Sequence, residues 1–166
     1  MSLSRFFIAM FDLERLPGQT GNYVIVAYST IPFSLKMRKF GLLELPAGYY
    51  LYCGSAHGPG GLRSRISRHL AKQTAKFWHF DYLKEYLQPQ CVWWQINVAN
   101  FECETAQFLA ALAGANCVVR GFGASDCRRG CSSHLVYFPK KAQMRRAWSA
   151  LKKQDWQYAQ MCTEAD

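Results

Sequence analysis

The fold of this chain is decided by residues 49–70, which read YYLYCGSAHGPGGLRSRISRHL. Residues 49–53 are aromatic and apolar, a composition typical of a β-strand. Residues 54–61 are small and rich in glycine, so they predict a loop. A helix is predicted from residue 62 to about 73, because its apolar residues recur with helical spacing. These residues, at i, i+4 and i+8, are Leu62, Ile66 and Leu70.

Strands and helices are predicted on both sides of this stretch. The strands span residues 23–28, 41–45, 91–98, 118–119 and 135–138. The helices span residues 77–87, ended by Pro89, and 102–113, ended by Gly114. We therefore expect an α/β fold: a single small domain with a mixed or antiparallel central sheet flanked by helices, followed by a basic C-terminal helix.

Turn and charge patterns divide the chain into three parts. Residues 1–20 form an N-terminal leader that ends in a turn, residues 21–138 form the domain, and residues 139–166 form a basic helical tail. The tail interleaves six Lys and Arg residues with Trp148 and Trp156. These tryptophans have two interpretations: they stack on nucleic-acid bases, or they cover the core.

Composition limits the classes of partner and compartment. The chain has 166 residues and 20 Lys+Arg against 11 Asp+Glu, a net charge of +9 that attracts polyanions. Half of the residues are apolar, which argues against disorder, and no apolar run approaches the ~20 residues of a membrane helix. Seven cysteines, an odd number without a disulfide-like spacing, fit a reducing compartment. We expect a soluble, cytoplasmic protein.

Several residue types suited to phosphodiester chemistry occur in close succession. Two strands carry Tyr23 and Tyr52, and the basic helix carries Arg65 and His69 on one face, one turn apart. The helix from residue 102 adds acidic side chains. Cleaving a phosphodiester requires a base or a metal to activate water, a cation to neutralise the phosphoryl oxygens and a carboxylate to hold the metal.

The order of these motifs resembles that of the GIY-YIG nuclease superfamily. The matching segments are Gly21-Asn22-Tyr23, Tyr52-Cys53-Gly54-Ser55-Ala56 and Arg65-Ile66-Ser67-Arg68-His69, followed by a helical glutamate. The chain is more closely similar to the small stand-alone Uri-type branch, through residues 78–83, 122–127 and 134–135. The resemblance covers about residues 20–138. The chain departs from the pattern in having Asn22 and Cys53 at middle positions, and in lacking a Pro-x-Tyr-Asn-like close.

The resemblance implies a role for each matching residue. Tyr23 matches the tyrosine proposed to activate the attacking water, and Tyr52 matches the tyrosine that helps order the site. Arg65 matches the arginine that stabilises charge on the phosphorane, and His69 matches a helix position often occupied by His or Tyr.

The resemblance also implies one divalent ion, Mg²⁺ or Mn²⁺, held by a glutamate. That residue is Glu102 or Glu104, and we prefer Glu102 because its neighbours Ala106 and Leu109 leave room for an ion. For the substrate, Arg63, Arg68 and Lys72 on the basic face of the 62–73 helix, where we also place His69, are the predicted nucleic-acid contacts.

Structural interpretations compete with these catalytic ones. Strand tyrosines usually pack a sheet, and a cluster of charges is usually a solvated helix face. His79 and Asp81 are more typical of a capping or hydrogen-bonded pair than of a catalytic dyad. The glycine-rich loop at residues 54–61 is not a phosphate-binding P-loop, because no Gly-Lys-Ser/Thr follows it.

Cys127, Cys131 and His134 form a candidate structural group. Their spacing is a weak zinc signal, because structural zinc sites have four ligands and only three are present. His79 or Asp126 are candidates for the fourth ligand. We favour buried thiols and a hydrogen-bonded histidine over a zinc site.

The sequence therefore predicts a metal-dependent endonuclease that acts on nucleic acid, with DNA favoured. The alternative is a binding module that keeps the fold without the chemistry, and a third, weaker option is a zinc-stabilised interaction protein. The choice between DNA and RNA, and between single and double strands, stays open because no recognition module is appended. Specificity is left to residues 28–45, the tail or a partner.

Overall fold

A computed structural model describes residues 13–71 and 75–160, and every structural statement below refers to this part of the chain. Lys72 and the expected end of its helix at residue 73 lie outside it. The elements, in chain order, are a 3₁₀ turn η1 (Leu13–Arg15), β1 (Gly21–Ser29), β2 (Phe33–Met37), β3 (Gly41–Leu45), β4 (Gly48–Ala56), α1 (Gly61–Leu70), α2 (His79–Leu83), β5 (Gln88–Ile96), α3 (Glu102–Ala110), β6 (Leu135–Phe138), α4 (Lys141–Lys152) and β7 (Gln157–Gln160).

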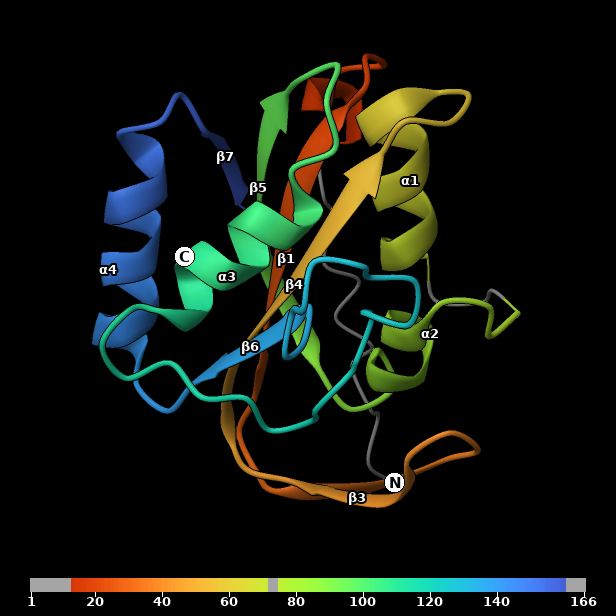
Figure 1. Ribbon diagram of the computed structural model, residues 1–166, viewed down its shortest axis with the longest axis vertical. Coiled ribbons are helices and arrows are strands. Elements are labelled where there is room, and N and C mark those ends of the chain that lie inside the picture. Colours follow the sequence, from red (N-terminus) through yellow and green to blue (C-terminus); the bar gives the residue numbers. More distant parts are fainter. Residues whose placement is uncertain (1–12, 72–74, 161–166) are drawn as a thin grey trace, which may run out of the picture.

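Five strands form one sheet in the order β6-β4-β1-β5-β7, and every neighbouring pair is antiparallel (Figure 1). Strands β2 and β3 form a separate antiparallel hairpin. The expected α/β fold with a central sheet flanked by helices is confirmed, and of the two expected sheet types the antiparallel one is correct. None of the described helices is long and apolar enough to cross a membrane.

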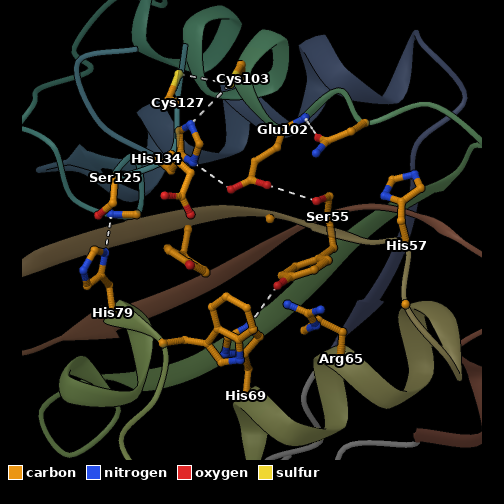
Figure 2. A pocket seen from close by; sticks show the side chains of 18 of the residues that line it. Ser55, His57, Arg65, His69, His79, Glu102, Cys103, Ser125, Cys127 and His134 are labelled. Carbon is orange, nitrogen blue, oxygen red and sulfur yellow. Dashed lines mark hydrogen bonds and ion pairs between the residues drawn. The ribbon is translucent and has the colours of Figure 1, made fainter. Parts of the chain in front are cut away.

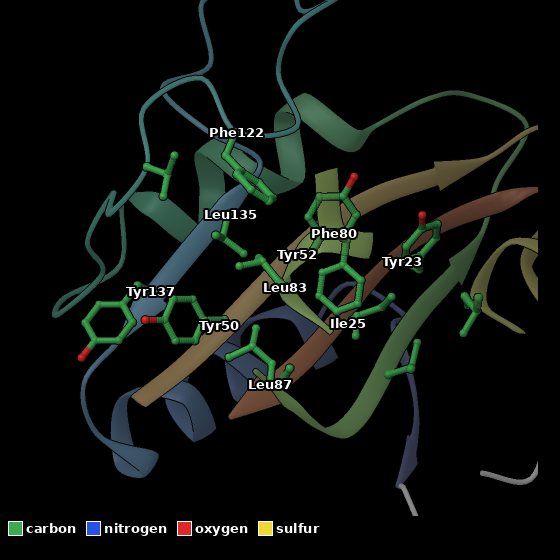
Figure 3. Close-up of a cluster of buried hydrophobic side chains, with 14 of the residues drawn as sticks. Tyr23, Ile25, Tyr50, Tyr52, Phe80, Leu83, Leu87, Phe122, Leu135 and Tyr137 are labelled. Carbon is green, nitrogen blue, oxygen red and sulfur yellow. The ribbon is translucent and has the colours of Figure 1, made fainter. Parts of the chain in front are cut away.

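The sheet has a hydrophobic core on each face, because successive side chains of a strand point to opposite sides. On β1, Tyr23 and Ile25 join one core with residues of α1 and α2 (Figure 3). Val24 and Val26 join the other core with residues of α3 and α4. Strand β1 is therefore buried on both faces, and a pair of helices covers each face of the sheet (Figure 1).

Two local expectations are wrong, and Pro89 explains one of them. The predicted helix over residues 77–87 is only His79–Leu83, and β5 already begins at Gln88. Pro89 lies inside that strand, opposite Ala27, where the register of β1 and β5 shifts. Such an irregularity tolerates a residue without a backbone N–H. Residues 118–119 form no strand; they belong to the irregular segment 111–134 between α3 and β6.

The expected peripheral tail is instead part of the domain as far as residue 160. Helix α4 buries Met144, Ala147 and Leu151 against the second core, and β7 pairs with β5 as an edge strand. Trp156 is buried, and Trp148 packs on Trp93 with ring centroids 5.4 Å apart. The tryptophans therefore cover the core, as one of the two interpretations held.

The described end of the expected leader also packs on the domain. Leu16 is fully buried in the first core. The backbone N–H groups of Leu62 and Arg63 donate to the carbonyls of Gln19 and Pro17, each at 2.9 Å. These bonds satisfy N–H groups that the first turn of a helix leaves unpaired, and so fix the start of α1.

Candidate functional site

A pocket of about 710 Å³ opens between α1 and α2 on one side and α3 with the 111–134 segment on the other (Figure 2). We call its first side the tyrosine wall, which consists of Tyr23, Tyr52, Arg65, His69 and Trp78. We call its second side the cysteine wall, which consists of Glu102, Cys103, Cys127, Arg128 and His134. The pocket thus collects Tyr23, Tyr52, Arg65, His69 and Glu102, the five residues proposed for catalysis.

Tyr23 and His69 form a buried hydrogen-bonded pair on the tyrosine wall. The Tyr23 hydroxyl lies 2.8 Å from Nε2 of His69. Burial raises the pKa of Tyr23 well above its ordinary 10. Burial also lowers the pKa of His69, against the opposing effect of Asp81. At neutral pH the phenol and the imidazole of the pair are therefore both uncharged.

The position of His69 corrects the sequence analysis. We expected it on the solvated face of the helix, but only 1% of it is exposed. His69 lies on the buried face of α1 together with Leu62 and Ile66. A histidine in an otherwise basic run does not reveal its burial, because imidazole is compatible with both environments.

Asp81 stands behind His69. Its Oδ1 lies 3.8 Å from Nδ1 of His69, and its side chain is completely buried. Its Oδ2 accepts the backbone N–H groups of Phe77 and Trp78, at 3.0 and 2.8 Å. Burial alone would raise the pKa of Asp81, but His69, these N–H groups and Lys84 hold it well below its usual value. Asp81 is a capping residue, as expected, and it also places a negative charge beside the imidazole.

His79 does not form the hydrogen-bonded pair with Asp81 that the sequence analysis considered. Its Nδ1 accepts the backbone N–H of Gly123 at 2.8 Å, which ties α2 to the 111–134 segment. The structural interpretation of His79 as a hydrogen-bonded residue is therefore correct, with a different partner.

Arg65 and Tyr52 complete the tyrosine wall. The guanidinium of Arg65 lies over the Trp78 ring, 4.5 Å from its centroid, and lines the pocket. Stacking on an aromatic face restricts the long side chain and presents a fixed positive charge. Tyr52 packs on Phe80 at 5.1 Å and meets the edge of His69 at 5.7 Å, so it holds the imidazole from the side.

Gly54 explains how Tyr23 fits into the sheet. It lies directly opposite Tyr23 in the β1–β4 ladder. A Cβ atom at Gly54 would run into the Tyr23 ring and hydroxyl. The glycine after the second tyrosine therefore creates the space that the first one occupies.

Glu102 begins α3 and connects the cysteine wall to β4. Its Oε2 accepts a hydrogen bond from Oγ of Ser55 at 3.0 Å, and its Oε1 lies 2.7 Å from Nδ1 of His134 (Figure 2). Glu104 forms an ion pair with Arg129 instead. Of the two candidate glutamates, Glu102 is the one that lines the pocket.

The carboxylate of Glu102 could hold a divalent metal ion that keeps most of its water ligands. Its side chain is 20% exposed, and a carboxylate has more lone-pair sites than its two hydrogen bonds use. Mg²⁺ in nucleic-acid enzymes is held by one or two carboxylates together with water and substrate oxygens. Asp126 lines the same pocket as a second carboxylate.

Four potential metal ligands gather at the outer edge of the cysteine wall. The ligand atoms of Cys103, Cys127, Cys131 and His134 all lie within 4.8 Å of one another, so the cluster could hold a metal ion. Backbone N–H donation from Cys131 lowers the pKa of Cys127 to about 6. The expected group of three was therefore incomplete, and Cys103 of α3 supplies the fourth position that we considered for His79 or Asp126.

Of the expected nucleic-acid contacts, Arg63 and Arg68 do not line the pocket, and Lys72 lies outside the described residues. Arg68 is 38% exposed and lies near both Phe77 and Asp81. Nε of Arg63 donates to the carbonyl of Leu16 at 2.8 Å, so this residue also has a structural role. The sequence analysis assigned no role to the pocket-lining Ser55, His57 and Arg128. Ser55 and His57 lie in the stretch 54–61 that the sequence predicts as a loop, which was the available signal; the structure places Ser55 in β4.

Comparisons with known proteins give a single finding. Residues 22–156 match the family model described as "Domain of unknown function DUF123". Neither the curated proteins nor the solved structures contain a match to this chain. The matched range includes both walls of the pocket and every element from β1 to α4, except for the first residue of β1. It also includes the first part of the tail. The chain belongs to the DUF123 family.

Proposed function

We propose that this protein is a metal-dependent endonuclease of the GIY-YIG type, which hydrolyses phosphodiester bonds of nucleic acid, with DNA favoured, in the cytoplasm. The observation that carries the proposal is the convergence of the Tyr23–His69 pair, the stacked Arg65 and the carboxylate of Glu102 on one pocket. The net charge of +9 suits a polyanionic substrate. The six described cysteines are free, which suits a reducing compartment.

The tyrosine wall supplies a base. Tyr23 does not ionise at neutral pH, because burial raises its pKa, so it acts through His69. A water molecule in the pocket gives a proton to the Tyr23 oxygen while the Tyr23 proton passes to Nε2 of His69. The carboxylate of Asp81 stabilises the resulting imidazolium from the Nδ1 side.

Arg65 stabilises the charge that develops on the phosphoryl oxygens. Its guanidinium is held by Trp78 before the substrate arrives, so little reorganisation accompanies the reaction. Glu102 holds the divalent ion, and Ser55 and His134 orient its carboxylate. When bound, Mg²⁺ supplies further electrostatic stabilisation of the phosphate.

The test is incubation of the purified full chain with labelled single-stranded, double-stranded and branched DNA and RNA, with Mg²⁺, with Mn²⁺ and with chelator. We expect metal-dependent cleavage of at least one substrate. Glu102→Gln should remove the response to added Mg²⁺, whereas Glu104→Gln, which breaks a surface ion pair, should retain it.

The alternative is a nucleic-acid-binding module without cleavage activity. The basic residues around the pocket would serve such a module equally well, but it has no need of a carboxylate beside a polyanion. Binding without cleavage across the whole panel would establish this alternative and reject the nuclease.

A further inference from the structure

We propose that Cys103, Cys127, Cys131 and His134 bind one structural zinc ion, and that this ion fixes the carboxylate of Glu102 through His134. The zinc site is independent of nuclease activity. Only the second part, concerning Glu102, rests on the proposed function.

The ligand set points to zinc. Three thiolates and one imidazole are the ligands of a closed Cys₃His zinc site, while Mg²⁺ and Ca²⁺ prefer oxygen. Tetrahedral zinc with ordinary Zn–S and Zn–N bonds places its ligand atoms about 3.5–3.8 Å apart. Here Cys103 Sγ lies 3.6 Å from Nε2 of His134 and 3.3 Å from Cys127 Sγ. These two separations are thus already close to those that a shared ion requires, and all four ligand atoms lie within 4.8 Å of one another.

His134 is oriented as a zinc ligand. Its Nε2 faces the sulfur atoms, and its Nδ1 faces Oε1 of Glu102 at 2.7 Å. A metal-bound histidine commonly donates its other ring N–H to a carboxylate, which fixes both groups. The chain from zinc through His134 to Glu102 therefore connects the cluster to the pocket.

The thiolates have hydrogen-bond donors of their own. The backbone N–H of Arg129 donates to Cys127 Sγ at 3.4 Å, and Nε2 of Gln107 donates to Cys131 Sγ at 3.6 Å. Such donors stabilise negative charge on sulfur. Exposed Cys117, by contrast, lies outside the cluster and approaches only the carbonyl of Ser132, at 3.9 Å.

The surrounding chain has a structural need for such an ion. Residues 111–134 contain no helix or strand, only an isolated bridge between Asn116 and Tyr137. Segments of this length without regular structure are uncommon in compact domains. A zinc ion joining Cys127, Cys131 and His134 to Cys103 on α3 would anchor the second half of this segment to a helix.

The test is the metal content of the full chain, purified without chelator and measured by inductively coupled plasma mass spectrometry. We expect about one zinc per chain in the parent and in Cys117→Ser, and less than about a fifth of that in Cys103→Ser and Cys131→Ser. A parent with negligible zinc, or a Cys103→Ser variant that retains a full zinc, would overturn the site. So would an intact mass showing a disulfide between Cys103 and Cys127.

A second measurement does not depend on whether a variant folds. The parent is produced with Co²⁺ in place of zinc and its visible absorption is recorded. We expect thiolate-to-cobalt charge transfer and the intense bands of tetrahedral Co²⁺. Weak bands typical of an octahedral ion would contradict the proposal.

The link to Glu102 is tested on zinc-free protein that remains folded. We expect the Mg²⁺ concentration for half-maximal cleavage to rise at least several-fold in Cys131→Ser, and not in Cys117→Ser. An unchanged Mg²⁺ dependence would reject the link while leaving the zinc site standing. Stoichiometric zinc in a parent that cleaves nothing would reject the nuclease and leave the metal site intact.

Discussion

The two walls of the pocket are built by different means. The tyrosine wall stands on regular elements, β1, β4, α1 and α2. Its residues Tyr23, Tyr52 and His69 are buried, and Arg65 is stacked on Trp78. The cysteine wall stands on the start of α3 and on an irregular segment, and its ligands are intermediate in burial except for His134. The comparison indicates that burial positions the proposed base on one side. On the other side, the proposed zinc ligands would take the place of packing.

The largest effect is expected on the tyrosine wall. Tyr23→Phe removes the hydroxyl that bonds His69 but keeps the buried ring, so the fold should survive and cleavage should fall by about 10²–10⁴. The measurement is single-turnover cleavage, with folding checked by circular dichroism. Tyr28→Phe is the matched control, because Tyr28 lies on the same strand and packs on Tyr49 away from the pocket. Equal rates for Tyr23→Phe and the parent would remove the base from the mechanism.

The two walls carry arginines with different expected roles. Arg65→Ala should lower cleavage by about 10²–10³ and weaken binding only modestly, because the fixed charge acts mainly on the transition state. Arg128→Ala, on the cysteine wall, should weaken binding and leave the rate at saturating substrate within a few-fold. Parallel binding and cleavage assays separate the two effects. Equal losses of binding and of cleavage in both variants would show that the two arginines do not have these different roles.

The pH dependence of cleavage by the Asp81→Asn variant tests the proposed role of Asp81 beside His69. Burial holds the pKa of His69 below 6.5, and the carboxylate of Asp81 partly opposes that shift, while Arg65 and Lys84 act in the same direction as burial. In the proposed mechanism cleavage requires neutral His69, so the rate should fall as the pH drops through this lowered pKa. Removing the charge of Asp81 should move the acid limb to lower pH and reduce the plateau rate about tenfold to a hundredfold.

The pH profile separates this role of Asp81 from its capping role. Asparagine retains an oxygen that can accept the N–H groups of Phe77 and Trp78, so a purely structural residue would leave the midpoint of the acid limb unchanged. A limb that moves to higher pH, or does not move, would contradict the relay.

The smallest effect concerns binding at different salt concentrations. Because phosphate contacts release counterions, log affinity should fall linearly with log salt, by roughly 0.7–0.9 for each contact. Removing one arginine from either wall should reduce that slope by about one contact. Affinity that does not change with salt would show that the basic residues do not contact phosphates.

The tyrosine wall is easier to predict from the sequence than the cysteine wall, for physical reasons. Aromatic strands and the helical spacing of Leu62 and Ile66 encode the sheet and α1 directly, so most of the fold was predictable. The motifs also singled out Tyr23, Tyr52, Arg65 and His69, which the structure brings together at one pocket. The burial of His69 was not, because it depends on where α1 packs. Asp81 was predicted as a cap, but its approach to His69 depends on the angle between α2 and α1.

The cysteine wall was less predictable because its contacts are distant in sequence and follow no periodicity. Cys103 precedes Cys127 by many residues and belongs to a helix, so spacing alone does not join them. The tail was misjudged for a related reason. Its basic residues suggested a solvated helix, yet Met144, Ala147 and Leu151 recur at near-helical spacing and mark a buried face.

The most direct test of the central claim measures zinc content and cleavage on the same preparations of Tyr23→Phe and Cys103→Ser. We predict that Tyr23→Phe retains about one zinc per chain and loses cleavage, while Cys103→Ser loses zinc and its folded fraction still cleaves when Mg²⁺ is raised. Zinc and cleavage that disappear together in both variants, or Tyr23→Phe protein that cleaves like the parent, would contradict the division of the pocket into a catalytic wall and a metal-held wall.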